Sequence, residues 1–81
     1  MKVIEKVSSR ETIFNLMPSS DNFDYQAFVT KIKNLKKQPF HDVYIFTPNE
    51  MCFAILKELK NKNIDIKQME IKHGLAKFEV A

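Results

Sequence analysis

The hydrophobic pattern is clearest between Asp42 and Asn63, where a short apolar run leads directly into an amphipathic segment. The run from Val43 to Phe46 contains only β-branched and aromatic residues, which is typical of a strand covered on both faces. Thr47, Pro48 and Glu50 then predict a helix start, with Thr47 and Glu50 as a capping box and Pro48 in the first turn. Apolar residues recur after it at helical spacing and predict one buried stripe: Met51, Ile55, Leu56 and Leu59.

A second helix is predicted upstream, because apolar residues there also share one face: Tyr25, Phe28, Val29, Ile32 and Leu35. This helix is expected to begin near Asp24, after a loop of turn formers whose Asp21 and Asn22 also suit a helix start, and Pro39 ends it, since proline cannot continue a helix. The helix after the central strand is expected to end at Asn61 to Asn63, because asparagine readily adopts the left-handed conformation found at helix C-termini.

The N-terminal part of the chain shows two strand patterns. Lys2 to Val7 and Thr12 to Met17 are short runs rich in β-branched residues, separated by the polar Ser8 to Arg10. They fit a hairpin, one long bent strand, or a first segment that pairs with another copy of the chain.

The C-terminal part fits a hairpin that turns at His73-Gly74. This turn places Met69 opposite Phe78 and gives the hairpin one apolar face and one charged face. The segment Ile64 to Ile66 is out of phase with that alternation, so we expect a bulge near Lys67-Gln68.

The predicted elements combine into an α/β (α+β) fold: a two-layer sandwich of order βαβαββ with an extra N-terminal strand, in which two helices cover one face of a mixed sheet. The 81 residues are expected to form a single domain, residues 1–81. The charged face of the C-terminal hairpin indicates that the second face of the sheet is open to solvent. Tyr44 and Phe46 point to this second face, so we expect the N-terminal segment, a dimer partner or stacked bases to cover them.

The composition excludes some classes of protein. No apolar run reaches the ~20 residues of a membrane span, and the first residues are too polar for a signal sequence, so we expect a cytoplasmic protein without membrane contact. The single cysteine, Cys52, cannot form an internal disulfide and fits a small core residue in a reduced compartment. The formal net charge of +3 is mildly basic, and Arg10 is the only arginine among 13 basic residues.

No constellation of residues indicates catalysis. The acidic residues are scattered, the single glycine excludes a glycine-rich phosphate loop, and the two histidines are not at metal-binding spacing. His41 at the start of a strand and His73 in a turn fit structural roles. We therefore predict no enzyme activity, no cofactor and no metal.

Two groups of residues fit binding. The first is a set of lysines on the two helices, which we expect to contact the backbone of RNA or DNA: Lys31, Lys33, Lys36, Lys37, Lys57, Lys60 and Lys62. These lysines also fit a simpler role, because cations complement the C-terminal end of a helix dipole and keep a surface soluble. The second group is the pair Tyr44 and Phe46, whose rings can stack on bases or pack against a protein partner.

The order βαβαββ, with the strand, turn and helix of VYIFTPNEMCFAI, resembles the fold shared by the C-terminal domain of bacterial translation initiation factor 3, the Alba nucleic-acid-binding proteins and the SirA-like sulfur-transfer proteins. In the initiation factor a strand ends in proline and an Asp-Tyr or Asp-Phe pair opens a lysine-rich helix, as at Pro18, Asp24-Tyr25 and Lys31 to Lys37. Thr47-Pro48-Asn49 replaces the factor's arginine- and glycine-containing loop that contacts ribosomal RNA, and Met17-Pro18 replaces the SirA-like Cys-Pro pair. The resemblance implies kinship of fold, which alone does not fix function, and the missing Cys-Pro pair argues against sulfur transfer.

The leading prediction is a small non-catalytic domain that binds the backbone of RNA or DNA through its helical lysines. With one arginine, readout of base sequence is expected to be slight. The alternative is a protein-interaction module, an inhibitor or adaptor of viral or mobile-element type, that contacts a host protein through its sheet face or forms a homodimer.

Overall fold

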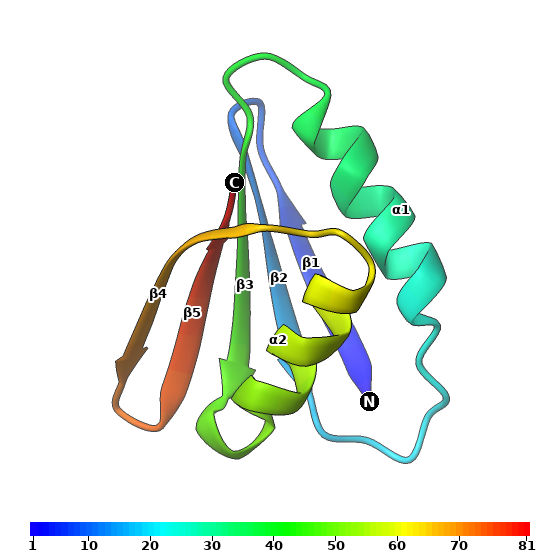
Figure 1. Cartoon of the computed structure of the whole chain (residues 1–81), viewed down its shortest axis with the longest axis vertical. Helices are drawn as coiled ribbons and strands as arrows, with labels where there is room; N and C mark the ends of the chain where they lie inside the picture. The colour runs from blue at the N-terminus through cyan, green and yellow to red at the C-terminus, as the bar shows by residue number, and fades with distance from the viewer.

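A five-stranded mixed sheet and two helices make up the structure, a computed structural model that describes residues 1–81 (Figure 1). In chain order the elements are β1 (Lys2–Val7), β2 (Glu11–Met17), α1 (Tyr25–Lys36), β3 (Asp42–Pro48), one turn of 3₁₀ helix (Asn49–Met51), α2 (Cys52–Asn61), β4 (Ile66–Lys72) and β5 (Leu75–Val80). The strands lie in the order β1-β2-β3-β5-β4, with β2 and β3 parallel and all other neighbours antiparallel. The predicted two-layer fold, βαβαββ behind an extra N-terminal strand, is confirmed.

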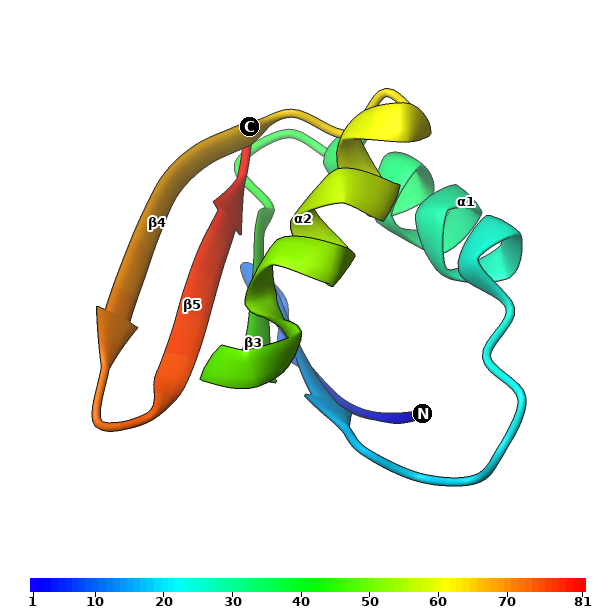
Figure 2. The same cartoon turned by 60° about the horizontal axis from the view of Figure 1, so that its bottom comes forward.

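Both helices lie on the same face of the sheet, as Figure 2 shows. The chain passes from β2 through α1 to the parallel β3, and from β3 through α2 to β4, which is also parallel to β3 because both strands are antiparallel to β5. The two crossovers step in the same direction along the sheet, and such crossovers are almost always right-handed. Two crossovers of the same hand and direction place both helices on one face, and the opposite face has no covering layer.

One hydrophobic core fills the space between the helices and the sheet. It contains 14 buried side chains from α1, α2, the three inner strands and the loop after α2: Phe14, Leu16, Phe28, Val29, Ile32, Val43, Ile45, Cys52, Ile55, Leu59, Ile64, Ala76, Phe78 and Val80. The rings of Phe14 and Phe28 meet edge to face with their centroids 5.1 Å apart, which joins β2 to α1. The predicted stripes are buried at Phe28, Val29 and Ile32 of α1 and at Ile55 and Leu59 of α2, and their other members are half-buried: Tyr25, Leu35, Met51 and Leu56. Cys52 is a core residue as predicted.

The helical layer does not reach the edge strand β4. Met69 and Ile71 lie opposite Phe78 and Ala76 in the hairpin, so they point to the helical side of the sheet, but both side chains are exposed. In Figure 1, β4 lies to one side of α2 and no element lies over it.

A buried polar pair joins the starts of the two parallel strands. The ring nitrogen Nε2 of His41 shares a hydrogen bond of 2.8 Å with Oγ1 of Thr12, and both residues are buried. Nδ1 of the same ring has no hydrogen-bond partner. The Lys36 ammonium group donates to the backbone oxygen of His41 at 3.2 Å, which ties the end of α1 to the same point. His41 therefore has a structural role, as predicted.

The predicted start of the second helix is wrong. Thr47 lies inside β3, is fully buried, and its hydroxyl donates only to the neighbouring Pro48 oxygen at 3.3 Å, so it caps nothing. The ladder between β3 and β5 continues to Pro48 opposite Leu75, and the Asn49 amide then donates to the Gly74 oxygen at 2.9 Å. These bonds to β5 hold the chain extended past Thr47, and α2 begins only at Cys52 after the 3₁₀ turn.

The other end of α2 and the start of α1 agree with the sequence. The predicted helix start near Asp24 is confirmed, and the Asp24 carboxylate caps α1 by accepting a hydrogen bond of 3.0 Å from the Ala27 amide. Asn63, with a φ of 63°, adopts the left-handed conformation expected after α2.

The two hairpins are also settled. The N-terminal segment forms the edge strand β1, antiparallel to β2, so of the three predicted arrangements the hairpin is observed. It does not cover Tyr44 and Phe46, and the expectation that it buries them is wrong. The register predicted for the C-terminal hairpin is confirmed, as is an irregularity between Ile66 and Gln68.

Replacing Thr12 by valine is expected to destabilise the protein by about 1–3 kcal/mol, because both nitrogens of the buried His41 ring would then lack a partner. Thr47→Val is a matched control, since Thr47 is equally buried but bonds only its neighbour's carbonyl. Urea unfolding of the two variants should show the larger loss for Thr12→Val. Equal losses would show that the Thr12 hydrogen bond contributes nothing.

The turn between β4 and β5 gives a second stability test. His73 and Gly74 have φ values of 53° and 77°, so both central residues are left-handed. Gly74→Ala adds a Cβ into open space and should cost about 1–2 kcal/mol through backbone strain alone. His73→Asn should keep or raise stability, because asparagine tolerates this conformation better. Urea unfolding measures both, and an unchanged Gly74→Ala variant would contradict the strain.

Candidate nucleic-acid interface

The seven lysines predicted to bind nucleic acid all lie on the helical layer. Lys31, Lys33 and Lys36 are in α1 and Lys57 and Lys60 in α2, while Lys37 and Lys62 are the residues that cap the two helix C-termini. We refer to these seven residues as the helical lysine surface. In Figure 1 both helices run from the lower to the upper end of the sheet, so their C-terminal ends point the same way.

Three of these lysines line one groove. Lys33, Lys36 and Lys37 in the last turns of α1 face the segment Asn63 to Asp65 after α2 across an open groove of about 390 Å³. Neither Lys33 nor Lys37 forms an ion pair with an acidic side chain. Lys33 and Lys37 are therefore free to contact an anion, while the Lys36 ammonium group already donates to the His41 backbone oxygen, and Asp65 is the one acidic side chain in the lining.

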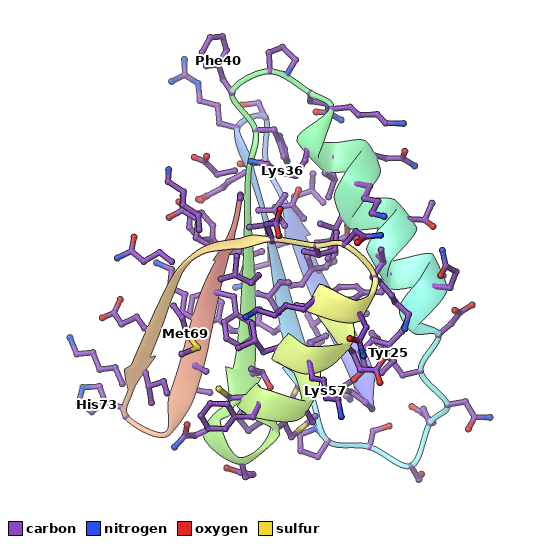
Figure 3. All side chains as sticks on the ribbon, in the orientation of Figure 1. Tyr25, Lys36, Phe40, Lys57, Met69 and His73 are labelled. Carbon is purple, nitrogen blue, oxygen red and sulfur yellow. The ribbon has the colours of Figure 1, made fainter.

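The other helical lysines are separate from this groove. The ammonium group of Lys31 pairs with Glu5 on β1 at 2.6 Å, and that of Lys62 pairs with Glu58 at 2.9 Å. Lys57 lies far from Lys36 along the helical layer, as Figure 3 shows. The structure thus brings together part of the predicted lysine set, and two of the seven are engaged in ion pairs.

The open face of the sheet carries the second predicted site. Tyr44 and Phe46 lie on the central strand β3, half-buried, with no element over them. Lys77 on the neighbouring β5 places its ammonium nitrogen 4.8 Å from the centroid of the Tyr44 ring and 5.8 Å from that of Phe46. Both distances are within the range of a cation–π interaction, so the two rings and one positive charge form a single unit.

Other residues of this face were missed by the sequence analysis. Exposed apolar side chains at Ile4, Met17 and Leu75 join Phe46 and Pro48 around a shallow hollow of about 410 Å³. Lysines on the two edge strands and on β5 also point to this face: Lys2 and Lys6 on β1, Lys72 on β4 and Lys77 on β5. The sequence does place Lys2, Ile4 and Lys6 on one face of their strand, because they alternate with period two. Which face of the sheet this is depends on how the strand pairs with β2.

Most acidic residues of the open face lie at one end, while Glu70 on β4 lies opposite Lys77 towards the other end. Glu11 and Asp42 are paired neighbours at the start of β2 and β3. Glu79 forms an ion pair of 3.4 Å with Lys67, so its charge is compensated. The end of the open face that carries Phe46 and Leu75 is therefore the more positive one.

Phe40 is a further residue that the sequence did not indicate. Its side chain is 94% exposed and its φ is 59°, a conformation unusual for an aromatic residue. It lies at the tip of the molecule in Figure 3 and shares a surface depression with Arg10 and Pro39. The Pro39-Phe40 break was interpreted only as a helix end, because nothing in the sequence shows that the ring lacks a packing partner.

Comparison with known proteins assigns nothing further: the chain matches no family model, no curated protein and no solved structure. Neither helix is long and apolar enough to cross a membrane. No group of three or more histidine, cysteine or carboxylate side chains is placed to hold a metal ion.

The pKa of Tyr44 offers a test of the open face. Partial desolvation on the sheet, and then the carboxylates of Asp42, Glu79 and Glu11, raise the pKa of this phenol above its ordinary value of 10.0, while Lys67 lowers it. In a Tyr25→Phe variant, where Tyr44 is the only tyrosine, tyrosinate absorbance should titrate above pH 10.0. Adding Asp42→Asn should lower the pH midpoint of this titration. An unchanged midpoint would show that the Asp42 carboxylate does not influence the Tyr44 phenol.

The same shift fixes the sign of the effect on stability. Because the pKa of Tyr44 is raised, the folded chain holds the phenol proton more tightly than the unfolded chain does. The resulting contribution to the stability of the fold is fully present below pH 10.0 and is lost as the pH rises through the folded-state pKa.

Proposed function

We propose that this protein binds RNA or DNA through the sugar-phosphate backbone, and that its site is the part of the helical lysine surface without acidic partners: Lys33, Lys36, Lys37, Lys57 and Lys60. The observation that supports the proposal is the groove at the end of α1, where Lys33 and Lys37 have no acidic partner and Lys36 lies between them. A backbone phosphate placed in this groove would lie beside the side chains of Lys33 and Lys37, which have no acidic partner.

The type of cation favours contacts that do not depend on sequence. Lysine is a flexible point charge, whereas recognition of a guanine edge or a bidentate phosphate usually employs arginine. Arg10, the only arginine, lies in the turn between β1 and β2, outside this groove. Binding is therefore expected to be driven by the release of counterions from the phosphates and to weaken steeply with salt.

Removing three lysines that have no acidic partner should reduce the salt dependence of binding. In a variant with Lys33, Lys37 and Lys60 replaced by glutamine, the slope of log affinity against log salt for a single-stranded RNA should fall by about 2, since each lost phosphate contact contributes about 0.7. Anisotropy of a labelled mixed-sequence RNA between about 50 and 200 mM salt measures the slope. Lys36 is left in place because it also bonds the His41 backbone.

A matched control replaces three ion-paired lysines, Lys31, Lys62 and Lys67, by glutamine. Both triple variants lower the formal net charge from +3 by three, to zero, so a difference between them reflects position and not total charge. Equal losses in the two variants would argue against a defined site. The absence of any RNA or DNA binding by the unmodified protein at 50 mM salt would refute the proposal.

A second candidate function is a protein-interaction module that uses the open face. The exposed apolar side chains of Ile4, Met17 and Leu75 around one hollow favour it, because contiguous exposed apolar surface often marks a contact site. The partner in this case is a host protein or a second copy of the chain. Sedimentation of the pure protein, and capture from lysate with and without nuclease, distinguish the two functions, since only a protein partner survives nuclease.

A further inference from the structure

We propose that the open face of the sheet is a stacking platform for single-stranded nucleic acid, with one unpaired base on Tyr44 and the next on Phe46. The inference rests on the proposed function but adds a second surface, on the side of the sheet opposite the helical lysine surface. It gives the protein a preference for single strands, which backbone contacts alone do not provide.

The spacing of the two rings selects an extended strand. Tyr44 and Phe46 are two residues apart on one face of β3, and each residue of a strand rises about 3.4 Å, so the ring positions are about 7 Å apart. Successive bases on one strand of a duplex are only about 3.4 Å apart along the axis. Two neighbouring bases can therefore occupy both rings only if the strand is unpaired and stretched.

The charge beside Phe46 suits the phosphates of such a strand, which would approach from that end because the carboxylates of Glu11, Asp42 and Glu79 lie towards Tyr44. Lys77 lies opposite Phe46 in the register, with Glu70 as its neighbour on β4, and its ammonium group lies near both rings. Asn15 flanks Phe46 on the other side, and its amide can bond a base edge. Lys6 lies on β1, two strands from Tyr44, which is about 10 Å away at the usual strand spacing.

The same charges disfavour a protein as the occupant. The centre of a protein interface is depleted in lysine, because a buried ammonium group loses its water without full compensation. Here Lys77 lies directly beside the aromatic pair, so a protein covering the rings would also have to desolvate that charge. A phosphate compensates that charge, so a nucleic-acid strand can cover the rings without leaving the ammonium group unpaired.

Tyrosine fluorescence tests the platform without removing a residue of it. The chain has no tryptophan and two tyrosines, so in a Tyr25→Phe variant the emission comes from Tyr44 alone. A single-stranded thymidine oligonucleotide of about 12 nucleotides, a length within the range that small single-strand-binding folds cover, should quench this emission on binding. A duplex of the same length should quench it much less at equal saturation, because its bases are already stacked.

Substitution provides the second test. Phe46→Ala should weaken binding of the single-stranded oligonucleotide about 5- to 150-fold, the range found for removal of one base-stacking aromatic, and should weaken duplex binding little. Phe53→Ala is the matched control, since Phe53 is a 71% exposed phenylalanine on α2 at the helical layer, and it should leave both affinities unchanged.

The outcomes separate this inference from the proposed function. If no nucleic acid binds at low salt, both fail. If the lysine triple variant weakens binding while Tyr44 emission is not quenched and Phe46→Ala binds as before, the proposed function stands and the platform is wrong. If the pure protein sediments as a dimer that Phe46→Ala dissociates, the open face is an interface between copies and the platform is likewise wrong.

Discussion

The direction of the two crossovers is the constraint on which the rest of the structure depends. From β2 to β3 and from β3 to β4 the chain moves the same way across the sheet, and right-handed connections then place both helices on one side. The chain has no further helix to form a third layer. One face of β3 is thus in the core and the other is in solvent, although the strand is apolar on both. The half-buried state of Tyr44 and Phe46 follows directly from the topology.

The same constraint explains why cations gather at one end of the helical layer. Two helices that point the same way have the negative ends of their dipoles on the same side of the molecule, and each suitably placed lysine there stabilises the fold by about 0.3–1 kcal/mol. The structural and the binding interpretation of these lysines are therefore compatible. Lys36 shows this, because it lines the groove and also bonds the backbone of His41.

Local patterns in the sequence were sufficient for most of the fold. Helical periodicity placed the buried faces of α1 and α2, and the His73-Gly74 turn fixed the register of the last hairpin. The start of α2 was not predictable, because the amide of Asn49 bonds to Gly74, far along the chain, and this bond outcompetes the local capping signal of Thr47. Nothing in the sequence around Thr47 shows that this segment pairs with β5 and the turn before it.

The candidate site was less predictable than the fold for a related reason. A lysine is free or paired according to neighbours that are distant in sequence, as with Lys31 and Glu5 on different elements. Ile4 joins the apolar side chains of the open face only because β1 pairs with β2. This pairing was one of three arrangements that fitted the sequence. Phe40 is exposed only because no element packs over the tip of the molecule. In each case the missing information was tertiary.

The uncovered edge strand β4 has a consequence for behaviour in concentrated solution. Its free backbone groups, with the exposed Met69 and Ile71 beside them, could template pairing with another chain, which is the first step of aggregation. Lys67 and Lys72 stand at either end of this short apolar stretch and Glu70 in its middle, in the positions where gatekeeper residues protect natural sheet edges. The charges on β4 thus serve solubility, and neutralising them would expose the chain to self-association through this edge.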